Sequence, residues 1–306
     1  MDDRTKYLGG SDAAAVLGIS PWRSRYRLWC EKSGAEAPPS LDGIDYVYFG
    51  TLLEPIVAAE FARRANRKVR VKRALSVHKQ YPFLAGHIDR RILGARAGLE
   101  AKTSNAFDYK MWGFSTEDAE GNDAVPDHYV AQVDHYMMVE NFDYFYVAAL
   151  IGGNDFRWYR INRNEQREKV LLAAELEFWD MVQSGIAPEI TTEHDARKRW
   201  RQSVAQKAIV VQQSDRTLLL ELERLQVRGR EDDKRIKALR NTLIPMFQDA
   251  EFLMENDEVI ASMTNSSQER FDLEQARKEA KVNINVHVVL DAFQKRIPVR
   301  RLKVLV

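Results

Sequence analysis

The order of apolar and polar residues predicts alternating helices and strands over about the first 190 residues. Apolar side chains recur at the three-and-four spacing of a helix in some stretches and at every second position, as in a strand, in others. The predicted helices cover residues 46–64, 126–140 and a longer stretch that ends at Ser184, and the predicted strands lie within residues 75–103, 144–151 and 156–161. This alternation indicates an α/β fold in which helices flank a mixed central β-sheet.

The pattern changes beyond residue 190. Apolar residues from Val204 to Leu243 keep a three-and-four spacing, which Gly229 and Asp232 interrupt near the middle. Two antiparallel helices that turn near Gly229 explain this interruption better than one long helix. The predicted organisation is a core over residues 1–190 and a C-terminal extension over residues 191–306, with a helical hairpin at about 195–248 and a small β element, a β-hairpin and a final strand, at about 251–306.

Composition narrows the class of protein. The chain has one cysteine, Cys30, which can form neither an internal disulfide nor a four-cysteine metal site or iron-sulphur cluster. No apolar run reaches the roughly 18 to 20 residues of a membrane-spanning helix. We therefore expect a soluble protein without a membrane partner, in the reducing cytoplasm of a bacterial or phage-infected host cell.

The balance of 46 basic and 45 acidic side chains argues against a polycationic coat for nucleic acid. This balance is compatible with a local basic groove, because residues 63–73 hold seven cations and no acid.

Asp89 and the segment Glu100-Ala101-Lys102 carry the candidate chemistry. In a strand, Glu100 and Lys102 point to one face while Leu99, Ala101 and Thr103 point to the other. Two carboxylates and the Ala101 carbonyl are hard oxygen ligands for Mg²⁺ or Mn²⁺, and a lysine can hold or deprotonate water. The spacing suits phosphodiester hydrolysis. By itself it is equally compatible with an alternative in which Asp89 ends a strand at a turn and Glu100 and Lys102 form an ordinary surface ion pair.

Glu54 falls at helical spacing with the apolar residues Val57, Ala58 and Phe61. A carboxylate on such a stripe needs a cation, a metal ion or a capping role to offset the cost of burial. Because Pro55 follows it, a place in a first helical turn is the alternative.

Polar residues in the predicted helix 126–140 form a further candidate group. His128, Gln132 and Tyr136 recur every four residues and share one face. That face could contact phosphate oxygens or the lysine, and the alternative is a solvated polar face.

Four segments, in this order, resemble the lambda-exonuclease and YqaJ-type phage recombination nucleases of the PD-(D/E)XK superfamily. The segments are Gly9-Gly10-Ser11-Asp12 with Leu17-Gly18, Gly50 to Glu54, His87-Ile88-Asp89 with Leu99 to Thr103, and Tyr129 to Val133 with Met137. The resemblance covers residues 4 to about 140, and the tail is similar to the helical extension and small β element of YqaJ-type members.

The resemblance implies a restriction-endonuclease-like core and a set of residue roles. Glu54, Asp89, Glu100 and the Ala101 carbonyl would bind two Mg²⁺ ions, for which Mn²⁺ would substitute, Lys102 would activate water, and Gln132 would support the lysine or the scissile region. The residues implied in phosphate or DNA binding are Arg4 and Ser11 for a terminal 5′-phosphate, Arg23 and Arg25 as rival phosphate ligands, and His87 and Tyr136. His87 stands where the family pattern has a small hydroxylated residue, so its role stays open.

The function that the resemblance implies is an alkaline-type, Mg²⁺-dependent 5′-to-3′ exonuclease. It would act on the ends of linear double-stranded DNA and leave 3′ single strands for a phage-type single-strand annealing protein, as a homo-oligomer that family resemblance makes a trimer. An endonuclease or junction resolvase with the same core is one alternative. A catalytically silent DNA-binding protein is the other, and the intact Asp89, Glu100 and Lys102 count against it.

Overall fold

The computed structural model describes residues 3–113, 124–228, 233–271 and 294–304. The chain divides into two compact units, Met1–Pro188 and Glu189–Val306, which we call unit 1 and unit 2. None of the helices in these described ranges is both long enough and apolar enough to cross a membrane.

Unit 1 is built on a five-stranded sheet with the order β1-β4-β5-β6-β7. Strands β5 and β6 are parallel and the other neighbours are antiparallel, so the sheet is mixed. The strands are β1 (Val69–Val71), β4 (Arg90–Ile92), β5 (Ala97–Ser104), β6 (Tyr144–Ile151) and β7 (Asp155–Asn162), and β2 (Ser76–Val77) pairs separately with β3 (Ala85–Gly86). The predicted α/β fold with a mixed central sheet is confirmed.

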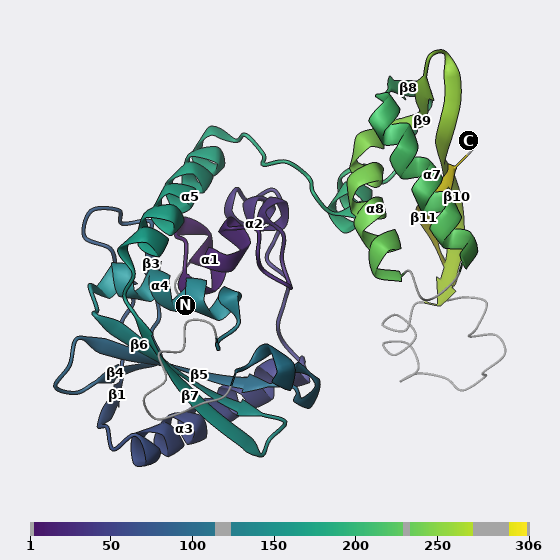
Figure 1. The fold of residues 1–306 in the computed structure, drawn as a ribbon. Coiled ribbons are helices and arrows are strands. Elements are labelled where there is room, and N and C mark those ends of the chain that lie inside the picture. Colours follow the sequence, from purple (N-terminus) through teal and green to yellow (C-terminus); the bar gives the residue numbers. More distant parts are fainter. Residues whose placement is uncertain (1–2, 114–123, 229–232, 272–293, 305–306) are drawn as a thin grey trace, which may run out of the picture. The chain divides into compact units, whose positions relative to one another are not determined.

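Helices cover both faces of this sheet. Helix α3 lies on one face, and α4 lies on the other, with α1 and α5 beyond it (Figure 1). The helices of unit 1 are η1 (Arg4–Lys6), α1 (Gly10–Val16), α2 (Arg25–Lys32), α3 (Asp45–Arg64), η2 (Ala106–Met111), α4 (Asp127–Glu140) and α5 (Glu165–Ser184).

The alternation of side chains along β6 creates two apolar layers. Phe145 and Val147 pack with Met137 of α4, whereas Tyr146 and Ala148 pack with the α3 side of the sheet. Because β5 follows the same alternation, Leu99 joins the α3 layer and Glu100 faces the side that α4 covers. The two-residue period of β5 thus determines that Glu100 faces α4 and not α3.

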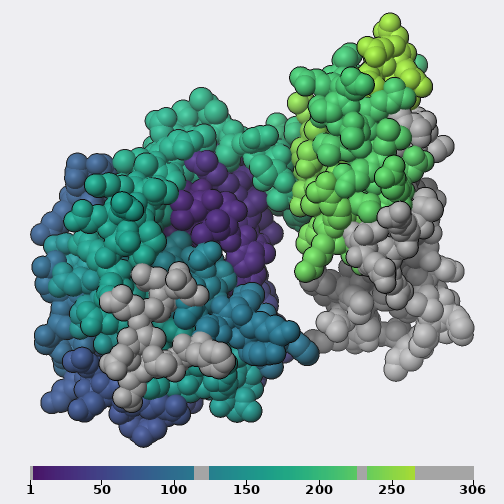
Figure 2. All heavy atoms as spheres, viewed as in Figure 1, coloured from purple at the N-terminus to yellow at the C-terminus, as the bar shows by residue number. Residues whose placement is uncertain are grey.

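The N-terminal helices pack against α5. Leu8, Ala15 and Leu28 share a buried cluster with Phe178 and Val182 of α5. Figure 2 shows the purple N-terminal residues lying against the teal residues of α5. This packing holds the segment that carries Arg4 and Ser11 on unit 1.

Two glycines let α1 and β3 approach α4 closely. A Cβ atom added at Gly10 would lie 2.6 Å from the ring of Tyr136, and one added at Gly86 would lie 2.7 Å from the same ring. Such distances are too short for real contacts, so any larger residue would push Tyr136 out of place. The Gly9-Gly10 and Gly86-His87 segments therefore meet at one helix.

Unit 2 has a four-stranded sheet with the order β11-β10-β9-β8, on which two helices pack. Buried leucines of the helices, among them Leu222 and Leu243, pack with Leu253 and Ile260 of the sheet. The elements are α6 (Glu193–Arg199), β8 (Val204–Val210), α7 (Gln213–Arg228), α8 (Asp233–Phe247), β9 (Ala250–Glu255), β10 (Glu258–Phe271) and β11 (Gln294–Val304).

The predicted helical hairpin is wrong at its start. Residues Val204–Val210 form strand β8, parallel to β9, and the helical pair begins only at Gln213. Val204 and Ala208, the first two positions of the predicted helical spacing, are exposed, so that spacing did not mark a buried stripe there. The β-branched run Ile209-Val210-Val211 suits a strand, and pairing with β9 satisfies its backbone.

Candidate active site

Glu100, Lys102 and Gln132 form a hydrogen-bonded network between β5 and α4. The Lys102 ammonium donates to Glu100 Oε1 at 2.7 Å and to Gln132 Oε1 at 3.0 Å. The Gln132 amide in turn donates from Nε2 to Glu100 Oε1 at 2.6 Å. Each of the three side chains therefore restrains the other two.

The electrostatics of the network keep Lys102 charged. Burial alone would lower the pKa of Lys102, but the attraction of Glu100 and its hydrogen bond outweigh burial and raise that pKa above its ordinary value. Lys102 is therefore an ammonium group that donates hydrogen bonds.

Asp89 lies directly before β4 and contacts β5, the strand that carries Glu100 and Lys102. Its Oδ2 accepts a hydrogen bond from the Ala101 amide at 2.9 Å. Burial, together with the negative charge of Glu100, raises the pKa of Asp89 well above its ordinary value. The second carboxylate and burial thus disfavour the charged form of Asp89.

The donor set fits a hard divalent cation. Glu100 Oε2 is buried and has no hydrogen-bond partner among the described residues. A buried carboxylate oxygen without a partner is costly unless a ligand compensates it. Asp89, Glu100 and the Ala101 carbonyl offer the oxygen ligands that Mg²⁺ and Mn²⁺ prefer.

Glu54 is close enough for its negative charge to help raise the pKa of Asp89, but it is not grouped with the other two carboxylates as a metal site. It lies in the interior of α3, which excludes the first-turn alternative, and its Oε1 pairs with Arg90 at 2.6 Å. Within the described ranges, no three His, Cys, Asp or Glu side chains are grouped so that they could hold a metal ion. Sequence reasoning missed Arg90, although it directly follows Asp89.

Arg4 and Ser11 lie together at the surface of unit 1. Arg4 Nη2 donates to Ser11 Oγ at 2.8 Å. Lys32 fixes this segment, because its ammonium donates to the carbonyl oxygens of Arg4 and Tyr7 at 2.6 Å each. A guanidinium beside a hydroxyl can bind a phosphate dianion.

Arg23 and Arg25 are paired with carboxylates. Arg23 contacts Asp12 and lies 2.6 Å from Glu31, and Arg25 lies 3.3 Å from Glu177. In this structure their charges are offset within the protein.

The other two candidates for DNA contact, His87 and Tyr136, differ in their exposure to solvent. His87 is exposed. Tyr136 is buried between Gly10 and Gly86, and its hydroxyl accepts a hydrogen bond from Gln132 Nε2 at 3.2 Å. Burial and the charge of Glu100 raise the pKa of Tyr136 well above its ordinary value. Tyr136 therefore stays neutral and supports Gln132.

Sequence reasoning also missed Tyr129 as a neighbour of the lysine. The Lys102 ammonium lies 4.8 Å from the centre of its ring. Part of the signal was available, because Tyr129 lies three residues before Gln132 on the same face of the predicted helix, but only the packing of α4 on β5 brings the ring to the lysine.

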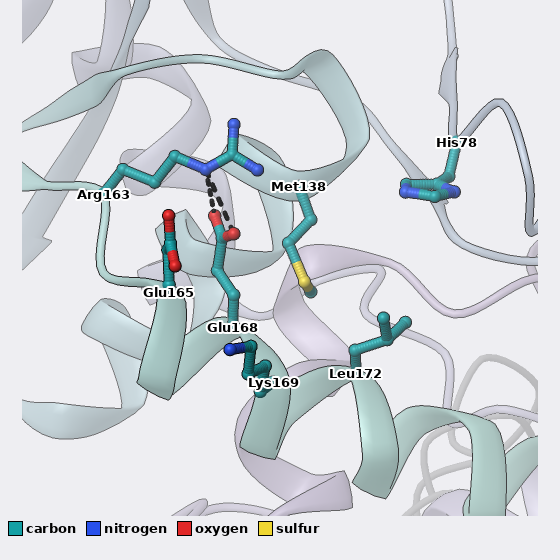
Figure 3. A pocket seen from close by; sticks show the side chains of 7 residues that line it. All are labelled: His78, Met138, Arg163, Glu165, Glu168, Lys169 and Leu172. Carbon is teal, nitrogen blue, oxygen red and sulfur yellow. Dashed lines mark hydrogen bonds and ion pairs between the residues drawn. The ribbon is translucent and has the colours of Figure 1, made fainter.

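A separate pocket of about 470 Å³ lies between α4, α5 and the segment after β2 (Figure 3). Its lining includes His78, Met138 and Lys169, and none of the predicted site residues belongs to it. Arg163 and Glu168, which also line it, pair at 2.8 Å, so they largely neutralise each other. The pocket is distinct from the carboxylate–lysine site.

Two carboxylates and a lysine at β4 and β5, supported by a helix-borne glutamine, are the side-chain set with which a metal-dependent nuclease cleaves a phosphodiester bond. The chain belongs to the family of the YqaJ-like viral recombinase domain, whose model matches residues 1–143. The uncharacterized protein YqaJ of Bacillus subtilis (strain 168) is 37% identical over 257 residues, which cover 82% of this chain and 78% of that protein. The family identified from the sequence is confirmed.

Solved structures with low sequence identity are also similar to parts of the chain. An alkaline exonuclease from Laribacter hongkongensis matches with a TM-score of 0.48 and 16% identity, over 64% of this chain and 94% of that one. A phage-related exonuclease from Haemophilus somnus 129PT matches with a TM-score of 0.40 and 13% identity, over 59% of this chain and 96% of that one.

Proposed function

We propose that this nuclease is a Mg²⁺-dependent 5′-to-3′ exonuclease that digests one strand of linear duplex DNA and leaves the other as a 3′ single strand. The observation that carries the proposal is the buried, unpartnered Glu100 oxygen beside Asp89 and Lys102. Clustered carboxylates with an unsatisfied oxygen are suited to a divalent cation, and an adjacent ammonium is suited to a phosphate oxygen.

The proposed metal ligands are Asp89, Glu100 and the Ala101 carbonyl, and Glu54 would join them as the third carboxylate by exchanging its ion pair with Arg90 for the metal ion. When bound, two Mg²⁺ ions, or Mn²⁺ in their place, would offset the negative charge of the phosphoryl oxygens. Lys102 would hold the attacking water or a phosphate oxygen. Gln132 contacts both Lys102 and Glu100, so it would fix the orientation of one against the other.

The 5′ polarity is supported by the pair of Arg4 and Ser11. The guanidinium and the hydroxyl lie 2.8 Å apart on the segment that Lys32 fixes. A terminal 5′-phosphate carries the charge and the acceptor oxygens that such a pair can bind. We place His87, which is exposed, among the DNA contacts.

The partners follow from this activity. The enzyme would bind the ends of double-stranded DNA and pass the 3′ strand to a single-strand annealing protein, in phage-type recombination. We propose that it works as a homo-oligomer, a trimer by family resemblance, in the cytoplasm of a bacterial or phage-infected host cell.

Digestion of a 5′-phosphorylated, end-labelled linear duplex tests the catalytic site. With Mg²⁺ the wild type should release nucleotides from the 5′ end, and a chelator should stop it. Asp89→Ala should abolish digestion, Lys102→Ala should slow it by about 10²- to 10⁴-fold, and Asp143→Ala, which removes an exposed carboxylate, should leave the rate unchanged. Digestion by Asp89→Ala at the wild-type rate would refute the metal site, and cleavage of covalently closed plasmid would favour an endonuclease.

The same assay tests the phosphate contact when duplexes with 5′-phosphate and 5′-hydroxyl ends are compared. Arg4→Ala should slow the phosphorylated duplex far more than the hydroxyl one. Lys6→Ala is the matched control, since Lys6 is an exposed cation of the same segment. An equal effect of Arg4→Ala on both duplexes would remove Arg4 from this role.

A further inference from the structure

The Lys102 ammonium contacts an aromatic ring in addition to its two hydrogen-bond acceptors. It lies 4.8 Å from the centre of the Tyr129 ring, 2.7 Å from Glu100 Oε1 and 3.0 Å from Gln132 Oε1. A cation within about 6 Å of a ring centre is attracted by the negative charge of the ring face. The ring therefore limits where the ammonium can move.

The Tyr129 ring is itself fixed by a stack of aromatic side chains. Trp112 stacks on Tyr129 with ring centres 5.4 Å apart, and on Tyr159 with centres 5.9 Å apart. Trp112 is 3% exposed, so this stack is part of the core. A ring held in this way cannot turn aside at low cost.

The stack is also anchored to the strand that carries the lysine. The Trp112 indole donates from Nε1 to Ser104 Oγ at 3.2 Å. Ser104 lies two residues after Lys102 on β5, and so on the same face of that strand. One face of β5 thus carries both the Lys102 ammonium and the Ser104 hydroxyl that holds the aromatic stack beside it.

Helix α4 contributes two of the contacts to Lys102, because Tyr129 and Gln132 lie almost one turn apart on it. An oxygen acceptor fixes the direction of one N–H, whereas a ring face confines the position of the charge. Together they define one place for the ammonium relative to Glu100.

We propose that Tyr129 is a positioning residue for Lys102, and that its ring face confines the ammonium to the site beside Glu100 and Gln132. The inference rests on the proposed function, in which Lys102 acts on water or on the scissile phosphate. The hydroxyl of Tyr129 has no part in this role, so a phenylalanine should perform it.

Steady-state digestion by two variants tests the role. Tyr129→Phe keeps the ring and should retain kcat within about twofold, whereas Tyr129→Leu should lower kcat about ten- to 100-fold with KM changed less than about twofold. Tyr144→Leu is the matched control, because it removes a ring 4.1 Å from the Arg160 guanidinium elsewhere on the sheet, and it should leave kcat unchanged. Wild-type kcat in Tyr129→Leu, or an equal loss in Tyr129→Phe, would overturn the proposal.

A double-mutant cycle in the unfolding equilibrium tests the contact without any use of activity. Tyr129→Leu, Lys102→Met and the double variant should be non-additive, with a coupling of about two- to 30-fold in the unfolding constant. Additive effects would overturn the contact.

If Tyr129→Leu does not fold, Tyr129→Met, which also lacks a ring, takes its place in both experiments. An inactive wild type with a coupled pair would refute the proposed function, whereas an active wild type with an uncoupled pair would refute this inference.

Discussion

The two units of the chain place their charged side chains differently. Both pack helices on a sheet, but unit 1 buries many ionisable groups, among them Asp12, Glu100, His135 and Glu175. In the part of unit 2 whose side chains are described, the buried carboxylates are Asp195 and Glu255, and the core is mostly leucine, isoleucine and phenylalanine. Buried charge costs free energy, so a unit that tolerates it must offset that cost with pairs or ligands.

The buried charges of unit 1 hold the elements that carry the candidate site. Lys32, which also supports the Arg4 segment, lies 2.7 Å from Asp12. His135 of α4 contacts Glu175 of α5 at 2.7 Å and the Ala85 carbonyl at 3.1 Å. In unit 1 ion pairs thus hold the helices that carry the site, whereas in unit 2 apolar packing dominates between helices and sheet, with the pair of Arg216 in α7 and Glu255 in β9, at 3.0 Å, beside it.

Asp12→Asn should have the largest effect on stability. Asp12 is 1% exposed, and the substitution leaves Lys32 and Arg23 beside it without its negative charge. We expect the free energy of unfolding to fall by about 3–5 kcal/mol, measured by chemical denaturation of the full chain. Asp143→Asn is the control, because that carboxylate is 58% exposed. An equally small change in both variants would show that the buried network does not stabilise unit 1.

The buried pair of His135 and Glu175 should make stability depend on pH. Burial alone would lower the pKa of His135, but Glu175 outweighs burial and raises that pKa above the ordinary 6.5. A raised folded pKa means that the stabilisation is fully present below 6.5 and is lost as the pH rises through the folded value. The unfolding temperature of the wild type should therefore fall over that range, by less than Asp12→Asn lowers it.

Substitution of the histidine tests the source of this pH dependence. His135→Gln should remove the fall in stability with rising pH, while His78→Gln should preserve it, because burial and the charge of His135 lower the pKa of His78, which contributes with the opposite sign. A pH dependence that persists in His135→Gln would assign it to other groups.

Glu221→Gln should have the smallest effect, because it breaks an exposed ion pair of unit 2. Glu221 accepts two hydrogen bonds from Arg235, at 2.7 and 2.9 Å, and both side chains face solvent. Exposed pairs add little to stability because water screens them. We expect an unchanged midpoint of thermal unfolding, and a loss as large as that of Asp12→Asn would remove the contrast between the units.

The sequence predicted those parts of the fold whose cause is local. The helix at 127–140 and the hairpin of β6 and β7 follow from periodicity, and both are present. The alternation along β5 correctly placed Glu100 and Lys102 together on one face. Strand β8 was missed because its apolar residues fall at helical spacing by chance, and only pairing with β9 decides its state.

The sequence by itself determined the family and the order of the candidate residues, because a motif and a strand period are written in neighbouring positions. Tertiary structure alone decided their partners: Glu54 pairs with Arg90, and the ring of Tyr129 lies beside Lys102. Such contacts join α3, α4 and the sheet across long stretches of chain. They depend on how these layers pack, and no local pattern of apolar and polar residues encodes that packing.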